Sequence, residues 1–466
     1  MMSMLRSGAI SGATILALGL AAAPAAAQKQ APPAVGVPKD FKLPPKREFA
    51  LPNGMQVTLV PFGTVPKVNV SLAVRAGRIN QGPDQVWLAD LTGDLMNEGT
   101  VSRTAAQVAE QAAAMGGEVS VGVGSDQTSV DGSGLSERAA DLVRLVADVA
   151  RHPRLPASEL ERIKGDRLRT LAISRSQPQP LADEKFRQIT YPDHPYGRVF
   201  PTEAMLKGYT IQQVRTFYAA NFGAARAHLY VAGVFDAAAV ERAVRAAFGD
   251  WARGALPVEN VPKPRSGRVV ELIDRPDAVQ STIIVGLPVP DPTSPDYTAL
   301  DVTDALLGGA FGSRITSNIR EQKGYTYSPF SSVTDRHHTA VWTEQADVTT
   351  RFTGASLTEI FNEIERLRRE APPAEELTGI ERNLAGVFTL RNSSRGGIIN
   401  QLQFVDGQGL TDQYLSGYVR RVLAVTPADV QRIAQRYLVP GRMAVVVVGD
   451  RKTVAGQLTP FRATVP

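Results

Sequence analysis

The sequence predicts an α+β fold made of two homologous αβ domains. The chain has 466 residues, more than a single hydrophobic core normally holds, and strand periods mix with helical periods along it. One pattern also occurs twice, a helical stretch followed by an apolar strand that ends in glycine. Three residue pairs stand at one constant separation in the two patterns: Val214 with Val430, Arg226 with Arg442, and Gly233 with Gly449. This constant separation indicates an internal duplication.

The amino terminus is predicted to be a secretory signal over residues 1–27. Arg6 supplies positive charge, an apolar stretch runs from Ala9 to Leu20, and Ala25 to Ala27 offer a small-residue cleavage site. The apolar stretch is shorter than the roughly 20 residues that a membrane-spanning helix needs, and no later segment is long and apolar enough. We therefore expect export to the periplasm and no membrane span.

Composition narrows the class of protein. Hydrophobic residues make up 43% and charged residues 21%, the balance of a soluble globular protein. The 51 basic residues are scattered among 46 acidic ones, without the basic stripe that a nucleic-acid binder would show. The chain has no cysteine, which excludes disulfides, thiolate ligands and cysteine nucleophiles.

The predicted elements follow in order along the chain. Residues 28–46 are rich in Pro, Lys and Ala and are expected to form an extended lead-in. Asn53-Gly54 between apolar residues predicts a hairpin at the start of the first domain. The alternation and helical spacing that follow predict strands at 68–74, 119–123 and 127–130 and helices at 103–115, 136–151 and 156–174.

A second linker is predicted at residues 256–268, where three prolines and Gly267 interrupt any period. This places the first domain at 47–255 and the second at 269–466.

Two α+β copies joined by a proline-rich linker resemble the pitrilysin, insulinase and mitochondrial processing peptidase family, over about residues 45–455. The most specific match is in the second half, where the Gly-rich turn at 306–315 leads to the segment 319–328, which is similar to the family's R-E-K-x-G-x-x-Y-S segment. Segments of the first half also match: His194 to Arg198, Asn53-Gly54 and Arg75 to Gly77. The resemblance implies that each domain is a mostly antiparallel sheet covered by helices, and that the chain forms half of a clamshell.

The zinc motif of catalytic members is degenerate in this sequence. Those members carry H-x-x-E-H, in which two His bind zinc and the Glu activates water. Asp90 and Asp94 stand at the two His positions and Gly93 at the Glu position, and the stretch 162–170 that should supply a third ligand contains no Glu. We expect no metal or cofactor in this chain, because zinc prefers imidazole and thiolate ligands. Two alternatives stay open for the aspartates: ligands of a hard cation, or solvated or capping carboxylates.

Two residues of the second half match a catalytic pair of the family. In catalytic members of the family, an Arg and a Tyr seven residues apart in the second half contact the substrate carbonyl across a closed chamber. Arg320 and Tyr327 match those positions. Guanidinium and phenol groups can donate hydrogen bonds to the oxyanion that forms on peptide attack. The structural alternatives are that Arg320 is an ordinary cation at the end of a helix that Gly324 caps, and that Tyr327 packs at the start of a strand.

The glycine-rich run and the histidines are interpreted as structural or are assigned no role. The Gly308 to Gly312 run lacks the Gly-Lys-Ser/Thr of a phosphate loop, and close backbone approach at a turn is the better interpretation. His194 lies in a Pro-Gly setting and is expected to be structural. No role is assigned to the remaining histidines, which show no ligand spacing with acidic partners: His152, His228, His337 and His338.

Two functions from different classes follow. The first is the non-zinc subunit of a heterodimeric zinc metalloendopeptidase, inactive alone, whose homologous partner supplies zinc and whose substrate is an extended peptide held at a sheet edge. The second is a noncatalytic dimeric peptide-binding or scaffold protein of the cell envelope. A neighbouring reading frame with an intact H-x-x-E-H would favour the first.

Overall fold

The computed structural model describes residue 36 and residues 38–462, and the chain from Pro38 onward forms one compact unit. The predicted signal at 1–27 lies outside the described residues and stays a prediction, as does most of the lead-in. Residues 38–46 form no helix or strand. Among the described residues, no helix has the length and apolar character that crossing a bilayer requires.

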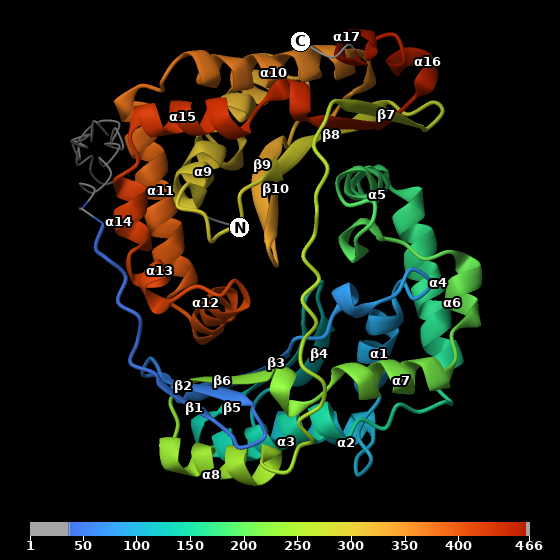
Figure 1. Ribbon diagram of the computed structural model, residues 1–466, viewed down its shortest axis with the longest axis vertical. Helices are drawn as coiled ribbons and strands as arrows, with labels where there is room; N and C mark the ends of the chain where they lie inside the picture. The colour runs from blue at the N-terminus through green and yellow to red at the C-terminus, as the bar shows by residue number, and fades with distance from the viewer. Residues whose placement is uncertain (1–35, 37, 463–466) are drawn as a thin grey trace, which may run out of the picture. The chain divides into compact units, whose positions relative to one another are not determined.

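The first half of the chain builds a six-stranded sheet in the order β1-β2-β6-β3-β5-β4 (Figure 1). All neighbouring strands are antiparallel except β2 and β6, which are parallel. The buried strands carry Val, Leu and Ala on both faces, the composition that suits a sheet covered on both sides. The strands are β1 (Arg47–Ala50), β2 (Gln56–Pro61), β3 (Lys67–Val74), β4 (Val119–Val123), β5 (Thr128–Leu135) and β6 (Ala227–Gly233).

The second half builds a five-stranded sheet in the order β7-β11-β8-β10-β9. Again one neighbouring pair is parallel, β7 with β11, and the others are antiparallel. The parallel pair occupies the same place in both sheets, because its inner strand, β6 or β11, is also the antiparallel neighbour of the next long strand, β3 or β8. The strands are β7 (Val269–Asp274), β8 (Gln280–Val289), β9 (Phe330–Arg336), β10 (Thr339–Thr349) and β11 (Ala444–Gly449).

Helices cover the sheets in a repeated order, which confirms the predicted α+β fold of two homologous parts. The pattern that predicted the duplication is α7 followed by β6 in the first half and α15 followed by β11 in the second. The first half contributes α1 (Leu88–Met96), α2 (Ala105–Ala114), α3 (Ala139–Arg151), α4 (Leu160–Ser176), α5 (Pro178–Thr190), α6 (Glu203–Gly208), α7 (Ile211–Asn221) and α8 (Ala237–Phe248). The second half contributes α9 (Tyr297–Asp304), α10 (Thr353–Arg369), α11 (Ala374–Arg391), α12 (Arg395–Gly407), α13 (Asp412–Ser416), α14 (Tyr418–Leu423), α15 (Pro427–Tyr437), α16 (Arg451–Val454) and α17 (Thr459–Arg462).

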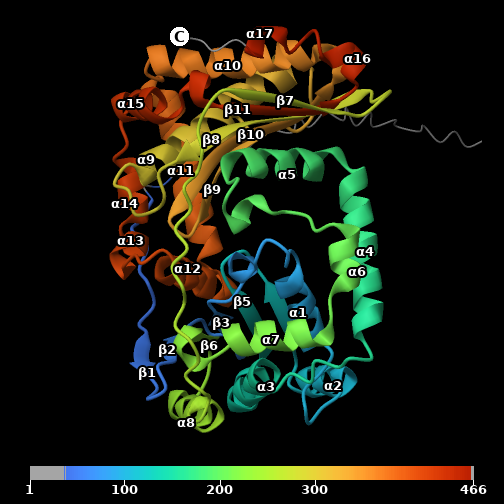
Figure 2. The same cartoon turned by 45° about the vertical axis from the view of Figure 1, so that its right-hand side comes forward.

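One helix of each half packs against the sheet of the other half. Helix α5 lies against β8 and β11, and α12 lies against β3 and β6 (Figures 1 and 2). Phe186 of α5 is buried with Ile284 and Val446 of the second sheet, while Ile398 of α12 is buried with Tyr230 of the first. Fully burying such side chains stabilises by about 1.5–3 kcal/mol each. The exchange therefore couples the two halves through apolar burial.

The local predictions largely hold. The hairpin at Asn53-Gly54 joins β1 to β2, with Gly54 at φ +97, a conformation that glycine adopts without a Cβ penalty. The predicted strands appear as β3, β4 and β5, and the predicted helices as α2, α3 and α4. Residues 256–268 contain no helix or strand. The domain boundaries on either side of them stay predictions.

Candidate functional site

Helix α1 carries the degenerate zinc motif and is almost wholly buried. Leu88, Leu91 and Leu95 face the first core, spaced as a helix that packs one stripe inward. The Gln81 side chain accepts from the Ala89 backbone N–H at 2.8 Å, satisfying a donor that the first turn leaves free. Asp90 and Asp94 are one turn apart on this helix and therefore lie on the same face.

Both aspartates bind arginines. Asp90, whose side chain is 3% exposed, accepts from Arg78 Nη2 at 2.6 Å and from Arg78 Nε at 2.9 Å. Asp94 accepts from Arg167 Nε at 2.5 Å and from Arg167 Nη2 at 2.7 Å. Arg167 also lies 3.7 Å from Asp90. The alternative of a solvated or capping carboxylate does not hold for buried Asp90, and two bidentate ion pairs balance the charge of the two carboxylates.

Arg167 comes from the stretch that was expected to supply a third metal ligand. It lies in α4, next to α1, and its guanidinium is 5.9 Å from the ring of Trp87. A delocalised, weakly hydrated guanidinium suits a site enclosed by carboxylates and an aromatic face. The hydrogen bonds that Arg78 donates to Asp90 raise the pKa of the Arg78 guanidinium. Two cations thus flank the aspartates at which the sequence resemblance predicted metal ligands, and a metal ion there would face them directly.

Gly93 lies against the edge strand β4. A Cβ at Gly93 would come within 2.4 Å of Val123 Cγ2, a contact that real Cβ atoms do not make, so a glutamate there would displace the valine. At the end of the same helix, the Asn97 amide binds the outer edge of β4, donating to Val121 O at 3.2 Å and accepting from Val121 N at 2.9 Å. This side chain pairs with an edge residue as a neighbouring strand would.

Arg320 and Tyr327 lie together in the second half. The Arg320 guanidinium is 4.9 Å from the Tyr327 ring centroid and 4.5 Å from that of Phe311. The two rings are 79% and 75% exposed, so Tyr327 does not pack into a core at a strand start. Among the described residues, its hydroxyl has no hydrogen-bond partner. The arrangement presents a guanidinium and a phenol on an exposed aromatic surface.

Arg320 lies near the end of a helical segment. Arg320 lies in a π-helical segment, Thr316–Gln322, a geometry frequent at functional sites. Gly324 follows at φ +65 and donates to Arg320 O at 3.2 Å, so it caps the segment as expected. Arg320 Nε is also 3.1 Å from Glu321. Among the described residues, neither Arg320 nor Tyr327 forms a hydrogen bond or ion pair with the cluster of Asp90 and Asp94.

The Gly-rich run makes a close approach within a second π-helical segment, Ala305–Gly309. A Cβ at Gly308 would come within 2.5 Å of Ser331 Oγ and 2.6 Å of Glu344 Oε2. Close approach is therefore confirmed, although it occurs in a helix rather than at a turn. Glu344 is fully buried, and burial raises its pKa well above the ordinary value. Burial also raises the pKa of neighbouring Asp304 to about 7.

The histidines divide into structural residues and one cluster that sequence reasoning missed. His194 is buried, accepts from Tyr196 N at 3.3 Å and lies 3.1 Å from Asn260 O, as a structural residue would. Desolvation lowers its pKa. His337 and His338 were assigned no role because they show no ligand spacing with acidic partners in the sequence, but the linker brings Glu259 to them in the fold. The separation of 78 residues between Glu259 and His337 left no local spacing to recognise.

Comparison with protein families gives two matches. The family described as insulinase (peptidase family M16) matches residues 59–200. The family described as peptidase M16 inactive domain matches residues 208–384. The first match spans the degenerate motif and the second spans Arg320 and Tyr327.

Individual relatives are similar over most of their length. An uncharacterized zinc protease of Mycobacterium bovis is 26% identical over 423 residues, which cover 86% of this chain and 93% of the relative. The crystal structure of a peptidase M16 inactive domain from Pseudomonas fluorescens has a TM-score of 0.80 at 23% identity, covering 87% of this chain and 98% of that one. A Helicobacter pylori protease has a TM-score of 0.81 at 19% identity, with 88% and 100% covered. The two structures share the fold described above.

Proposed function

Because this chain belongs to the insulinase-like peptidase family M16, we propose that it is the non-zinc subunit of a heterodimeric zinc metalloendopeptidase. In this proposal the chain is inactive alone, and a homologous partner chain supplies zinc, its ligands and the water-activating Glu. The single observation that carries the proposal is the pairing of Asp90 and Asp94 with Arg78 and Arg167. In the proposal, these arginines take the place that a metal ion would have on this helix in a zinc-binding partner.

The replacement disfavours zinc at this locus on electrostatic grounds. Two unit charges 4 Å apart interact by about 4 kcal/mol at an effective dielectric constant near 20, and a divalent ion doubles that figure. A zinc ion beside Asp94 would therefore be repelled by Arg167 unless the arginine left. Gly93 offers no carboxylate to activate water. In this proposal the first half of the chain keeps the motif helix in place, and the partner supplies the groups that perform the hydrolytic step.

Arg320 and Tyr327 are the chemical contribution of this chain in the proposal. Zinc in the partner would supply the attacking hydroxide. The guanidinium of Arg320 and the hydroxyl of Tyr327 would donate hydrogen bonds to the carbonyl oxygen as negative charge develops on it. One preorganised donor of this kind typically lowers a barrier by about 3–4 kcal/mol. The high exposure of Tyr327 in the isolated chain supports a surface that a partner covers.

The substrate in the proposal is an extended peptide that adds to a sheet edge. β4 is an edge strand of the first sheet, adjacent to the motif helix. Strand addition relies on backbone hydrogen bonds, so sequence selectivity would be modest. We also propose export to the periplasm, on the amino-terminal pattern at residues 1–27.

The experiment is reconstitution with a zinc-bearing homologue from the same organism. Hydrolysis of a quenched fluorescent peptide library is measured for this chain alone, for the homologue alone, and for the two at equal concentration. The proposal expects activity in the mixture that exceeds the sum of the separate chains, together with a complex of both chains on gel filtration. A complex with no gain in hydrolysis would favour the noncatalytic scaffold instead.

A further inference from the structure

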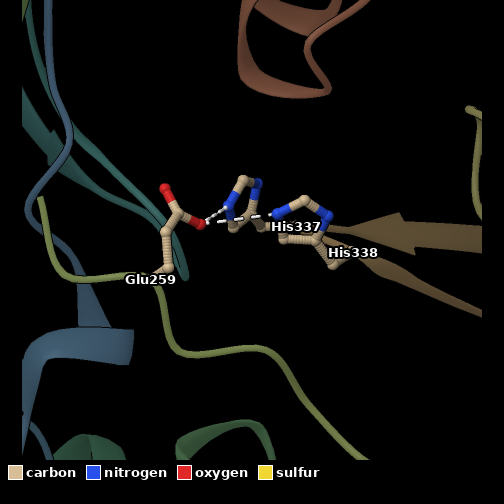
Figure 3. A group of neighbouring side chains, drawn as sticks. All are labelled: Glu259, His337 and His338. Atoms are coloured by element: carbon tan, nitrogen blue, oxygen red, sulfur yellow. Dashed lines mark hydrogen bonds and ion pairs between the residues drawn. The ribbon is translucent and has the colours of Figure 1, made fainter.

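A two-residue turn at the tip of the β9–β10 hairpin presents two histidines to the linker. Arg336 pairs with Thr339, and His337 and His338 form the turn between them. His338 has φ +58, a left-handed conformation that costs an L-residue on the order of 1–2 kcal/mol. Turns of this kind favour Asn-Gly or Gly, so a pair of histidines is an unusual choice for the turn itself. Their side chains converge on Glu259 (Figure 3).

From this convergence we propose that Glu259, His337 and His338 form a binding site for a divalent zinc-class metal ion. Glu259 Oε2 is 2.7 Å from His337 Nε2 and 3.4 Å from His338 Nε2, and the three donor atoms all lie within 4.8 Å of one another. Tetrahedral zinc with bonds of about 2.0–2.2 Å spaces its ligand atoms by on the order of 3.4 Å. Small side-chain adjustments would bring all three atoms to that spacing.

The second nitrogen of His337 is already fixed as a metal ligand requires. Its Nδ1 lies 3.1 Å from the carbonyl oxygen of Gly407, which can only accept, so Nδ1 carries a hydrogen. Metal-binding histidines commonly donate their other N–H to a backbone carbonyl in this way. In the neutral ring Nε2 then holds a lone pair, which points at a carboxylate oxygen. At the present 2.7 Å the two atoms share a proton, and a metal ion would replace that proton once the side chains move apart to about 3.4 Å.

The carboxylate is held in the matching orientation. Arg75 Nη2 donates to Glu259 Oε1 at 3.1 Å, which leaves Oε2 to the histidines. Metal-binding carboxylates are commonly hydrogen-bonded through such outer partners. Arg75 is also 3.5 Å from His337 Nε2, so its positive charge weakens the site. A cavity of about 320 Å³ adjoins the cluster and is lined by Arg75, Pro257 and His337, which leaves room for a water molecule as fourth ligand.

The ion would fasten the linker to the second half. Glu259 lies in the linker 256–268, His337 and His338 belong to the hairpin, and Gly407 ends α12. The neighbouring Arg336 binds Ser125 of the first half. The site is distinct from the Asp90–Asp94 cluster, and it departs from the sequence expectation that this chain carries no metal. The proposed metal site uses only the linker and the hairpin of this chain, so it does not depend on the proposed peptidase partner.

The test is zinc titration of the chelator-treated full chain by isothermal calorimetry, without any partner chain. One site per chain is expected, and His337→Asn, His338→Asn and Glu259→Gln should each weaken it by more than the roughly 10- to 100-fold that loss of an outer partner costs. The control is His152→Asn, which removes an exposed histidine paired with Asp148 and should leave the affinity unchanged. Circular dichroism of each variant verifies its folding, and His338, exposed at the turn, provides the least disruptive substitution.

A second readout is limited proteolysis within residues 256–268. Zinc should slow cleavage of the wild-type linker severalfold and leave the His338→Asn linker unaffected. The absence of zinc binding by the wild-type chain, or binding that survives all three substitutions, would overturn the inference. If zinc binding is abolished by Asp94→Asn and not by His337→Asn, both this inference and the proposed loss of the motif metal are overturned. If it is lost only on His337→Asn, the linker site is supported and the peptidase proposal is unaffected.

Discussion

Arg167 binds Asp94 through two parallel hydrogen bonds, with Nε 2.5 Å from Oδ2 and Nη2 2.7 Å from Oδ1. Asp94 stands at a position where the resemblance predicts a metal ligand, and Arg167 comes from the stretch 162–170 that was expected to supply another. In this chain the two side chains pair with each other. Such a bidentate pair has fixed geometry, so the locus retains a defined shape without a metal.

The ion pair between Arg78 and buried Asp90 should stabilise the folded chain. Arg78→Ala removes both hydrogen bonds to Asp90, which is 3% exposed and would keep only Arg167 at 3.7 Å. Breaking a buried pair on one side costs about 3–5 kcal/mol, and because Arg78 is partly exposed we expect roughly 2–3 kcal/mol in urea unfolding. The control is Arg169→Ala, whose exposed pair with Asp166 should change stability by less than about 1 kcal/mol. Equal effects of the two substitutions would contradict the assignment.

Restoring the histidines alone should not restore zinc binding. Asp90→His with Asp94→His recreates two ligands, but the Arg167 guanidinium remains beside them and repels a divalent ion. Adding Arg167→Glu removes the cation and supplies a third ligand, so this triple variant should bind zinc at a stoichiometry near one. Metal analysis is performed in a His337→Asn background to exclude the linker site. Tight binding by the double variant would show that Arg167 is not the obstacle.

Asp304 should make stability fall as pH rises through the weakly acidic range. Its pKa is about 7 in the folded chain against an ordinary value of 3.8, so between these values the unfolded chain releases a proton that the folded chain keeps. Stability from this group is complete below pH 3.8 and is lost as the pH approaches 7. Asp304→Asn keeps an acceptor for Ser331 and Trp342 but cannot ionise. Relative to wild type it should gain roughly 2–4 kcal/mol between pH 4 and 7, and a pH-independent difference would disprove this linkage.

Peptide addition at β4 should compete with Asn97. The Asn97 amide occupies both the N–H and the C=O of Val121 at the outer edge of the strand. Asn97→Ala frees these groups, so an extended peptide that adds to β4 should bind severalfold more tightly in fluorescence anisotropy. Glu98→Ala is the matched control, because Glu98 contacts Arg162 and not β4. Unchanged affinity in Asn97→Ala would place peptide binding at another edge.

Much of the fold was predictable because its signals are local. Asn53-Gly54 specifies a hairpin through backbone conformation, and the alternation of Val68 to Val74 matches β3 nearly residue for residue. The duplication was also visible, since it preserves spacing between helix and strand. The exchange of α5 and α12 between the sheets was not predictable, because the apolar stripe of a helix does not specify which of two similar sheets it covers.

For the candidate site, the sequence singled out residues but not their contacts, and the roles assigned to them stay predictions. The predicted loss of the zinc motif rests on the identities of Asp90, Gly93 and Asp94. The pairing of the two aspartates with Arg78 and Arg167 was not predictable, because long-range ion pairs leave no sequence period, although the basic character of 162–170 was a signal. Glu259 was missed for the same reason: an acidic residue in a proline-rich linker resembles a solvated one until the chain folds.

The measurement that tests the central claim most directly is peptide turnover by the reconstituted pair in which this chain carries Arg320→Ala or Tyr327→Phe. Because each donor is assigned about 3–4 kcal/mol of barrier lowering, kcat should fall by at least about 100-fold, while the zinc content of the partner and the yield of the complex stay unchanged. Turnover equal to wild type in both variants, in a complex of full zinc content, would contradict the account.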